Sequence, residues 1–348
     1  MLNAIGHRAW RFVQEGAPWT NVYGLARTMM ALSSALTLIL NRSALLWRPI
    51  AGVATRPPFC TAHTLQKGAL YCLMPTHLEP ARWIAVALLL VVASGWQPRI
   101  TGVLHWWLAV SYQLTASTLE GGDQAAAVLT LLLIPVTLTD PRSWHWQKAP
   151  SVPNGGGSVL SSIRALVALS ALLVVRIQVC GIYFHAAFGK LQGPEWTNGT
   201  AMYYWLSHPT FGATHAFAGI LRIILSNPAL LAGITWGSII VELFLFMGLF
   251  ATRPVRRVLL CLGIGLHLGI MLFMGLTSFS VTMFAALILY LRPTDEPFSL
   301  GGAGFRARFA EFRWPGQTKH QAGFPSYAST ATSHPIQHEP SHEAADCV

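Results

Sequence analysis

A histidine and a lysine stand five residues apart at the end of a long apolar run, in the stretch YFHAAFGKLQGPEW, which contains His185 and Lys190. A lysine amine that is withdrawn from water loses its proton more readily and can act as a base, and a nearby histidine can border the same cavity. A lysine at a membrane boundary can instead extend its ammonium group to the water as an anchor. Only four of the 23 basic residues are lysines, so an anchor here would be expected to be arginine. Both roles remain open for Lys190.

Aromatic residues follow Lys190 closely. The segment GPEWTNGTAMYYWLSHP is expected to be a loop, because glycine and proline punctuate it. Such a loop could act as a lid, or line a pocket for a flat, apolar ligand. The residues that would bind this ligand are Glu195, Trp196, Tyr203, Tyr204 and Trp205.

Among the ionisable residues inside apolar runs, three lie near mid-depth: Arg176, Glu242 and His267. Charge is costly there and usually faces a bundle interior or a watery cavity. Counted at about 1.5 Å per residue from the basic ends of their runs, the three lie at similar depth. We expect Arg176 to pair with Glu242, with His267 nearby, either in support of catalysis or as a structural pair that fixes the helix register. His105, beside two tryptophans, is expected to be an interfacial anchor.

Composition places these residues in a membrane protein. The chain of 348 residues is 53% hydrophobic and 10% charged, with a mean hydropathy of +0.47, whereas soluble domains contain about 25% charged residues. The apolar runs predict an all-α, polytopic transmembrane bundle of eight spans. A ninth crossing at 212–226 remains open. The eight runs are 23–40, 82–98, 102–119, 124–139, 165–188, 229–251, 257–275 and 277–292.

Basic residues gather at the ends of the apolar runs, and their distribution predicts an orientation. The formal net charge of +10 is therefore attributed to membrane orientation, and no nucleic-acid partner is expected. Arginine-rich turns such as ATRPVRR alternate with acidic or uncharged turns such as LEGGD, which predicts cytoplasmic termini and an outward-facing Lys190. Three regions result: a cytoplasmic interfacial segment at 1–20, a transmembrane domain at 21–293, and an amphipathic segment with a disordered cytoplasmic tail at 294–348.

The remaining candidates for chemistry are cysteines and histidines. Cys60 and Cys72 share one loop and would form a disulfide if that loop faces an oxidising compartment. Histidines in the tail are spaced by four residues, as metal ligands on a helix would be, but prolines between them argue against that helix. No metal site is predicted.

The segments around these residues resemble known membrane proteins. YFHAAFGKLQGPEW is similar to the segment of vitamin K-dependent γ-carboxylases in which a lysine, then a leucine, then an acid–tryptophan pair surround the catalytic base. Lys190, Leu191, Glu195 and Trp196 take those places. VELFLFMGLFATRPVRRVLLCLGIGLHLGIMLF resembles the same superfamily, the horizontally transferred transmembrane (HTTM) domain. SGWQPRITGVLHWW and GTAMYYWLSHPTFG resemble the bacterial sporulation-delaying protein B (SdpB) family.

The resemblance implies a multi-pass protein of the cell membrane that, with a small SdpA-like partner protein, is required to mature a secreted antimicrobial peptide from its precursor. It also implies a carboxylase-like enzyme in which Lys190 deprotonates a reduced quinone, such as menaquinol, at the extracytoplasmic face. γ-Glutamyl carboxylation itself is not expected, because Gly189 stands where the carboxylases have a second lysine, and their large lumenal region has no counterpart. The alternative is a non-enzymatic chaperone or export partner that binds the toxin peptide with the loop aromatics.

Overall fold

A computed structural model describes residues 18–49, 64–148, 159–208, 217–293 and 296–298, with the single positions 51, 57, 60 and 212. Within these ranges the chain is helical and forms no strand, which confirms the predicted all-α class. The helices are α2 (Asn21–Leu40), α3 (Ser43–Leu46), α4 (Thr64–Lys67), α5 (Leu70–Leu73), α6 (Leu78–Ser94), α7 (Pro98–Thr115), α8 (Gly121–Thr139), α9 (Val159–Leu191), α10 (Pro194–Thr197), α11 (Ala201–Leu206), α12 (Ala218–Ser226), α13 (Pro228–Met247), α14 (Arg253–Met274) and α15 (Thr277–Leu291).

Each of the eight predicted spans overlaps one long helix, but the count of eight crossings is not established. Among the described residues, five helices are long and apolar enough to cross a membrane: α2, α8, α9, α13 and α14. Helices α6 and α15 have 17 and 15 residues, which makes them short for a bilayer core of about 30 Å. Helix α12, at the site of the possible ninth crossing, has nine residues and is too short to cross.

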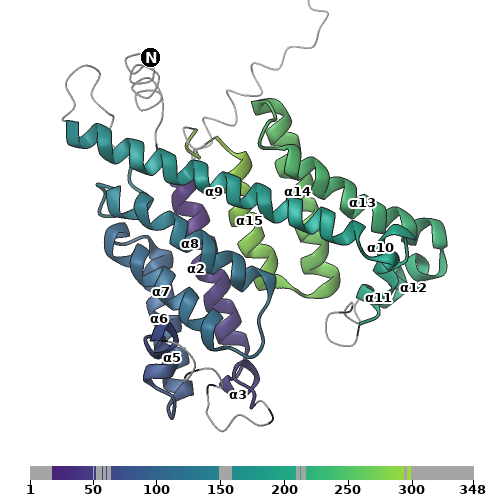
Figure 1. The fold of residues 1–348 in the computed structure, drawn as a ribbon, viewed down its shortest axis with the longest axis horizontal. Coiled ribbons are helices and arrows are strands. Elements are labelled where there is room, and N and C mark those ends of the chain that lie inside the picture. The colour runs from purple at the N-terminus through teal and green to yellow at the C-terminus, as the bar shows by residue number, and fades with distance from the viewer. Residues whose placement is uncertain are drawn as a thin grey trace, which may run out of the picture. The chain divides into compact units, whose positions relative to one another are not determined.

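Helix α9 connects the two halves of the described bundle (Figure 1). It packs on α8 and α15, and further along on α13 and α10. The other main contacts join α2 to α6 and α15, α7 to α8, and α14 to α15. With 33 residues, α9 rises about 50 Å, more than the bilayer core, so it must tilt or extend beyond the membrane. Because α9 is so long, the position of Lys190 at its end cannot be derived from the depth of the apolar run.

Small residues let several of these helices approach closely, as is usual where lipid removes the hydrophobic driving force between helices. A Cβ atom added at Gly122 on α8 would lie 2.7 Å from the Cα atom of Phe279 on α15. A Cβ atom added at Gly263 on α14 would lie 2.9 Å from the side chain of Leu287. Helix packing therefore requires glycine at Gly122, where the neighbour is backbone, whereas at Gly263 the Leu287 side chain would have to shift.

A disulfide joins Cys60 to Cys72 in the segment between α2 and α6. The predicted interfacial segment at the N-terminus and the amphipathic segment and tail at the C-terminus lie outside the described residues, apart from a few positions at their inner ends.

Candidate functional site

Lys190 forms an ion pair with Glu242. The Nζ atom of Lys190 lies 2.7 Å from both carboxylate oxygens of Glu242, and 3.5 Å from the carbonyl oxygen of Ala186 one turn earlier. The side chains of Lys190 and Glu242 retain 22% and 11% of their exposure. The pair is thus largely shielded but can still be reached from outside.

Local sequence explains why each partner stands where it does. Lys190 lies in the last turn of α9, where a cation is stabilised by the negative end of the helix dipole. Glu242 belongs to the buried stripe of α13, which is otherwise apolar or weakly polar and recurs at helical spacing. The members of this stripe are Leu231, Thr235, Ser238, Ile239, Glu242 and Leu245.

Trp196 closes one side of the ion pair. The Nζ atom of Lys190 lies 5.2 Å from the centre of the Trp196 ring, within the range of a cation–π interaction. Trp196 is buried and packs in a small apolar cluster with Ala201 and Ile239. The ring therefore covers part of the ammonium group.

A second polar pair, Tyr183 and His267, lies beside the first. The phenolic oxygen of Tyr183 is 3.0 Å from Nε2 of His267, and both side chains are buried. The other ring nitrogen of His267, Nδ1, has no hydrogen-bond partner among the described residues. Tyr183 precedes Lys190 by seven residues, two helical turns, so both point from the same face of α9. Four polar side chains from α9, α13 and α14 therefore share one region.

The expected pairing of Arg176 with Glu242 was wrong. The Nη2 atom of Arg176 lies 3.4 Å from the carbonyl oxygen of Arg292, and Glu242 pairs with Lys190 instead. The depth count had assumed that each helix starts at the membrane boundary and stands upright. Helix α9 begins at Val159 and has 33 residues, so its register against α13 differs from that count. His267, expected near this pair, is hydrogen-bonded to Tyr183 on α9.

His185 is not brought into this region. Its side chain is exposed and its ring contacts Phe184, at 6.3 Å between centres. Five residues correspond to a turn of about 140° on a helix, which directs His185 away from the face that carries Lys190.

The aromatic segment after Lys190 is helical rather than a loop. Pro194 starts α10, and Gly199, with φ of +81°, separates it from α11. A Cβ atom at Gly199 would also lie 3.0 Å from Ala232 on α13. The exposed aromatics Tyr203, Tyr204 and Trp205 lie on α11. A shallow pocket of about 480 Å³ is lined by Pro194, Glu195, Asn198, Thr200, Tyr204 and Trp205.

A buried polar cluster in the N-terminal half escaped sequence analysis. His145 follows α8, is fully buried, and its Nε2 lies 3.2 Å from Oγ1 of Thr28. Its Nδ1 lies 3.5 Å from Arg27, which also donates to Thr101 at 2.5 Å. Burial, together with the charges of Arg27 and Arg142, lowers the pKa of His145 to about 3. The sequence feature that indicates this cluster is Arg27, an arginine inside the apolar run 23–40.

Two further features belong to this cluster. Asp140 and Arg142 form a buried ion pair at 2.8 Å, and Arg142 also donates to the carbonyl oxygen of His145 at 2.8 Å. His105 was expected at the interface but is buried, at 1% exposure. Its helix, α7, packs against α6 and α8, so the His105 side chain is not available as an interfacial anchor. The cluster fastens the 140–148 segment to α2 and α7.

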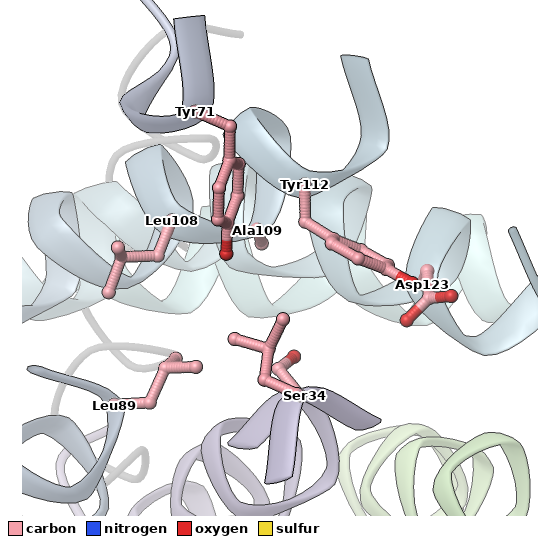
Figure 2. A pocket seen from close by; sticks show the side chains of 8 residues that line it. Ser34, Tyr71, Leu89, Leu108, Ala109, Tyr112 and Asp123 are labelled. Carbon is pink, nitrogen blue, oxygen red and sulfur yellow. The ribbon is translucent and has the colours of Figure 1, made fainter. Parts of the chain in front are cut away.

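Figure 2 shows a small cavity between α2, α5, α6, α7 and α8. Ser34, Tyr71, Tyr112 and Asp123 are its polar lining residues, and the hydroxyl group of Tyr112 points toward Asp123. Its volume is about 10 Å³, room for roughly one water molecule. The hydroxyl group of Tyr112 already donates to the carbonyl oxygen of Thr118 at 3.1 Å. A cavity of this size can solvate buried polar groups but cannot hold a substrate.

Among the residues that the structure describes, no three His, Cys, Asp or Glu side chains gather as a metal-binding set. The ion pair and the Tyr183–His267 pair can move or hold protons, and neither requires a metal for that role.

Comparisons with known proteins show which family the chain belongs to. The model of the HTTM domain family matches residues 160–294, a range that contains Lys190, Glu242 and His267. The uncharacterized protein YitO of Bacillus subtilis (strain 168) is 41% identical over 285 residues, covering 81% of this chain and 88% of YitO. The sporulation-delaying protein SdpB of the same strain is 32% identical over 292 residues, covering 83% of this chain and 86% of SdpB. No solved structure matches the chain.

Proposed function

This chain belongs to the family of the sporulation-delaying protein SdpB, and we propose that it is required to mature a secreted antimicrobial peptide, using base chemistry at Lys190. The observation that carries the proposal is the shielded Lys190–Glu242 pair, with Nζ 2.7 Å from both carboxylate oxygens. Its partners in that role are the toxin precursor and a small SdpA-like protein.

The pair can supply a base although its lysine is ion-paired. Two arrangements of one proton are possible along a 2.7 Å hydrogen bond: ammonium with carboxylate, or amine with carboxylic acid. Shielding from water disfavours the charged arrangement relative to the neutral one. When Glu242 takes the proton, Lys190 becomes a neutral amine that can accept a proton from a substrate. Tyr183 and His267 then support the change in charge as neighbouring hydrogen-bonding groups.

A reduced quinone, such as menaquinol, is a proposed co-reactant. The residues fit such a group in one respect, because the 22% exposure of the Lys190 side chain leaves room for a hydroxyl group to approach the amine. When bound, a quinol would supply a weakly acidic hydroxyl and reducing electrons. Lys190 would accept the proton, and Trp196 would keep the amine directed toward it.

The proposed orientation places this site at the extracytoplasmic face, with both termini in the cytoplasm. The Cys60–Cys72 disulfide supports that orientation, because disulfides persist in oxidising compartments. If the segment between α2 and α6 lies outside, α2 runs outward. With alternate crossings by α6, α7 and α8, α9 also runs outward and ends at Lys190.

A second candidate is a chaperone or export partner without catalysis. It is favoured by the exposure of Tyr203, Tyr204 and Trp205, which are 48%, 61% and 43% exposed on one short helix. Exposed aromatics beside a shallow pocket offer contact area to a peptide. In this case the aromatics of α11 would matter more than the chemistry of Lys190.

The test is the mass and killing activity of the secreted peptide from cells that carry Lys190→Arg, Lys190→Ala or the unmodified chain, with membrane levels compared. Arginine can keep the ion pair to Glu242 but is not deprotonated in proteins. Base chemistry therefore predicts no mature peptide from either variant at normal membrane levels. Full activity of Lys190→Arg would overturn it and leave the chaperone role.

A further inference from the structure

We infer that the cavity between α13 and α14 is a binding site for one acyl chain of an anionic phospholipid, whose headgroup lies near Arg257. The cavity has a volume of about 560 Å³ and a lining that is almost entirely apolar. It is bounded by α13 and α14 and by residues of α11 and α12. The inference is independent of the proposed peptide maturation.

Glycines on both walls hold the cavity open. Gly237 on α13 and Gly265 and Gly269 on α14 line it. A Cβ atom added at any of the three would meet nothing within 4 Å, in contrast to Gly263, where Leu287 stands 2.9 Å away. Glycine inside a helix costs roughly 1 kcal/mol relative to alanine. Helix packing does not account for that cost at these three positions, and the space beside each of them is open to a ligand.

The dimensions of the cavity fit a single hydrocarbon chain. Its lining on α14 extends from Cys261 to Met274, which corresponds to about 20 Å along the helix axis. One leaflet contributes about 15 Å of the bilayer core of about 30 Å. The groove is therefore longer than one leaflet is deep, and an acyl chain can lie along it.

Positive charge at one end of the cavity favours an anionic headgroup. Arg257 precedes Cys261 by one helical turn and lies on the same side of α14. Its side chain is 60% exposed and lies 3.4 Å from Glu296. Within the described residues, Arg253 and Arg257 share one carboxylate, that of Glu296, while Arg256 donates to the carbonyl oxygens of Gly248 and Leu249. The end of the cavity therefore carries excess positive charge, and the start of α14 adds its positive dipole.

The same geometry argues against a quinone as the occupant. A quinone in this cavity would need its polar head at the Lys190–Glu242 pair to react there. The cavity includes Ser238 and Val241 next to Glu242, but neither Lys190 nor Glu242 lines it. The basic residues of α14 lie before Cys261, at the start of the helix.

Two glycines on α13 provide a matched test. Gly237 lines the cavity and Gly233 does not, yet a Cβ atom at either position meets nothing within 4 Å. Gly237→Leu should fill the groove, while Gly233→Leu adds the same side chain one turn away. Native mass spectrometry of the purified full-length protein, titrated with dipalmitoyl phosphatidylglycerol, should show at least about tenfold weaker binding for Gly237→Leu. Gly233→Leu should bind within about twofold of the unmodified protein.

Arg257→Gln tests whether Arg257 binds the lipid headgroup. It should weaken binding of phosphatidylglycerol about fivefold or more and leave binding of phosphatidylcholine unchanged. Thermal unfolding without added lipid should show that all variants are folded. Equal binding by Gly237→Leu and the unmodified protein would overturn the proposal, as would a quinone that co-purifies with the unmodified protein and is lost in Gly237→Leu.

Cys261 gives an independent measurement in the same protein, because it is exposed and lines the cavity. Bound phosphatidylglycerol should slow its alkylation by a hydrophobic maleimide severalfold, as measured on the Cys261 peptide. An unchanged rate at saturating lipid would place the lipid elsewhere and contradict the proposal.

Discussion

Lys190 and Glu242 are 52 residues apart in the chain, and their charged groups lie 2.7 Å apart between α9 and α13. Both are mostly buried, and Trp196 covers the ammonium group. Removing one partner would leave a shielded, unpaired charge and destabilise the fold, whereas replacing both partners with uncharged side chains would not. The pair therefore couples the packing of two long helices to the proton chemistry proposed for Lys190.

Breaking the pair from one side should destabilise the protein more than removing both partners. Glu242→Gln or Lys190→Met each leaves a shielded charge, while the double variant Lys190→Met with Glu242→Gln leaves none. We expect a coupling of about 0.5–3 kcal/mol in the double-mutant cycle, measured by unfolding in detergent. Strictly additive effects would show that the two side chains do not interact in the folded protein.

Removing the Tyr183 hydroxyl group should reduce peptide maturation beyond its effect on stability. Tyr183→Phe leaves both nitrogens of His267 without a side-chain partner among the described residues, at a cost of about 1–3 kcal/mol. Tyr290→Phe is the matched control, since its hydroxyl is buried and donates to the carbonyl oxygen of Leu245 at 2.9 Å. If both variants lower maturation equally at equal membrane levels, Tyr183 has a structural role alone.

Aromatic substitutions on α11 separate the two candidate functions. Tyr204→Ala and Trp205→Ala remove exposed side chains that line the shallow pocket, so stability should change by less than about 0.5 kcal/mol. A peptide-binding role predicts a severalfold loss of secreted peptide. Unchanged secretion from both variants would count against the chaperone, and Leu73→Ala, an exposed residue on α5, serves as the control.

His145 should make the protein sensitive to acid. Its folded-state pKa is lowered to about 3 from 6.5, so between these values the unfolded chain binds a proton that the folded chain does not. Stability from this group is present above pH 6.5 and is lost as the pH falls toward 3, by at most about 1.4 kcal/mol per pH unit. His145→Gln should flatten this part of a stability–pH profile.

The sequence predicts the class of this fold and identifies individual site residues. It does not predict which side chains those residues contact. Composition alone indicates a helical membrane protein, and Glu242 and His267 stand out because ionisable side chains inside apolar runs are rare. Their neighbours depend on helix length and register, which the apolar pattern does not define: α9 begins six residues before the predicted run. The His145 ring packs directly on Gly24 and on Gly95, whose φ is +87°, and a side chain at either position would clash with it. Such contacts between distant segments leave no local pattern.

The orientation of the site is open to a direct test through the disulfide between Cys60 and Cys72. On intact cells, a membrane-impermeant reductant should free both thiols for an impermeant maleimide, and without reductant neither should react. Cys347 in the predicted cytoplasmic tail should react only after permeabilisation and serves as the control. Labelling of Cys60 and Cys72 that also requires permeabilisation would place their segment in the cytoplasm. With alternate crossings, Lys190 would then face inward, and a secreted precursor could meet it only before export.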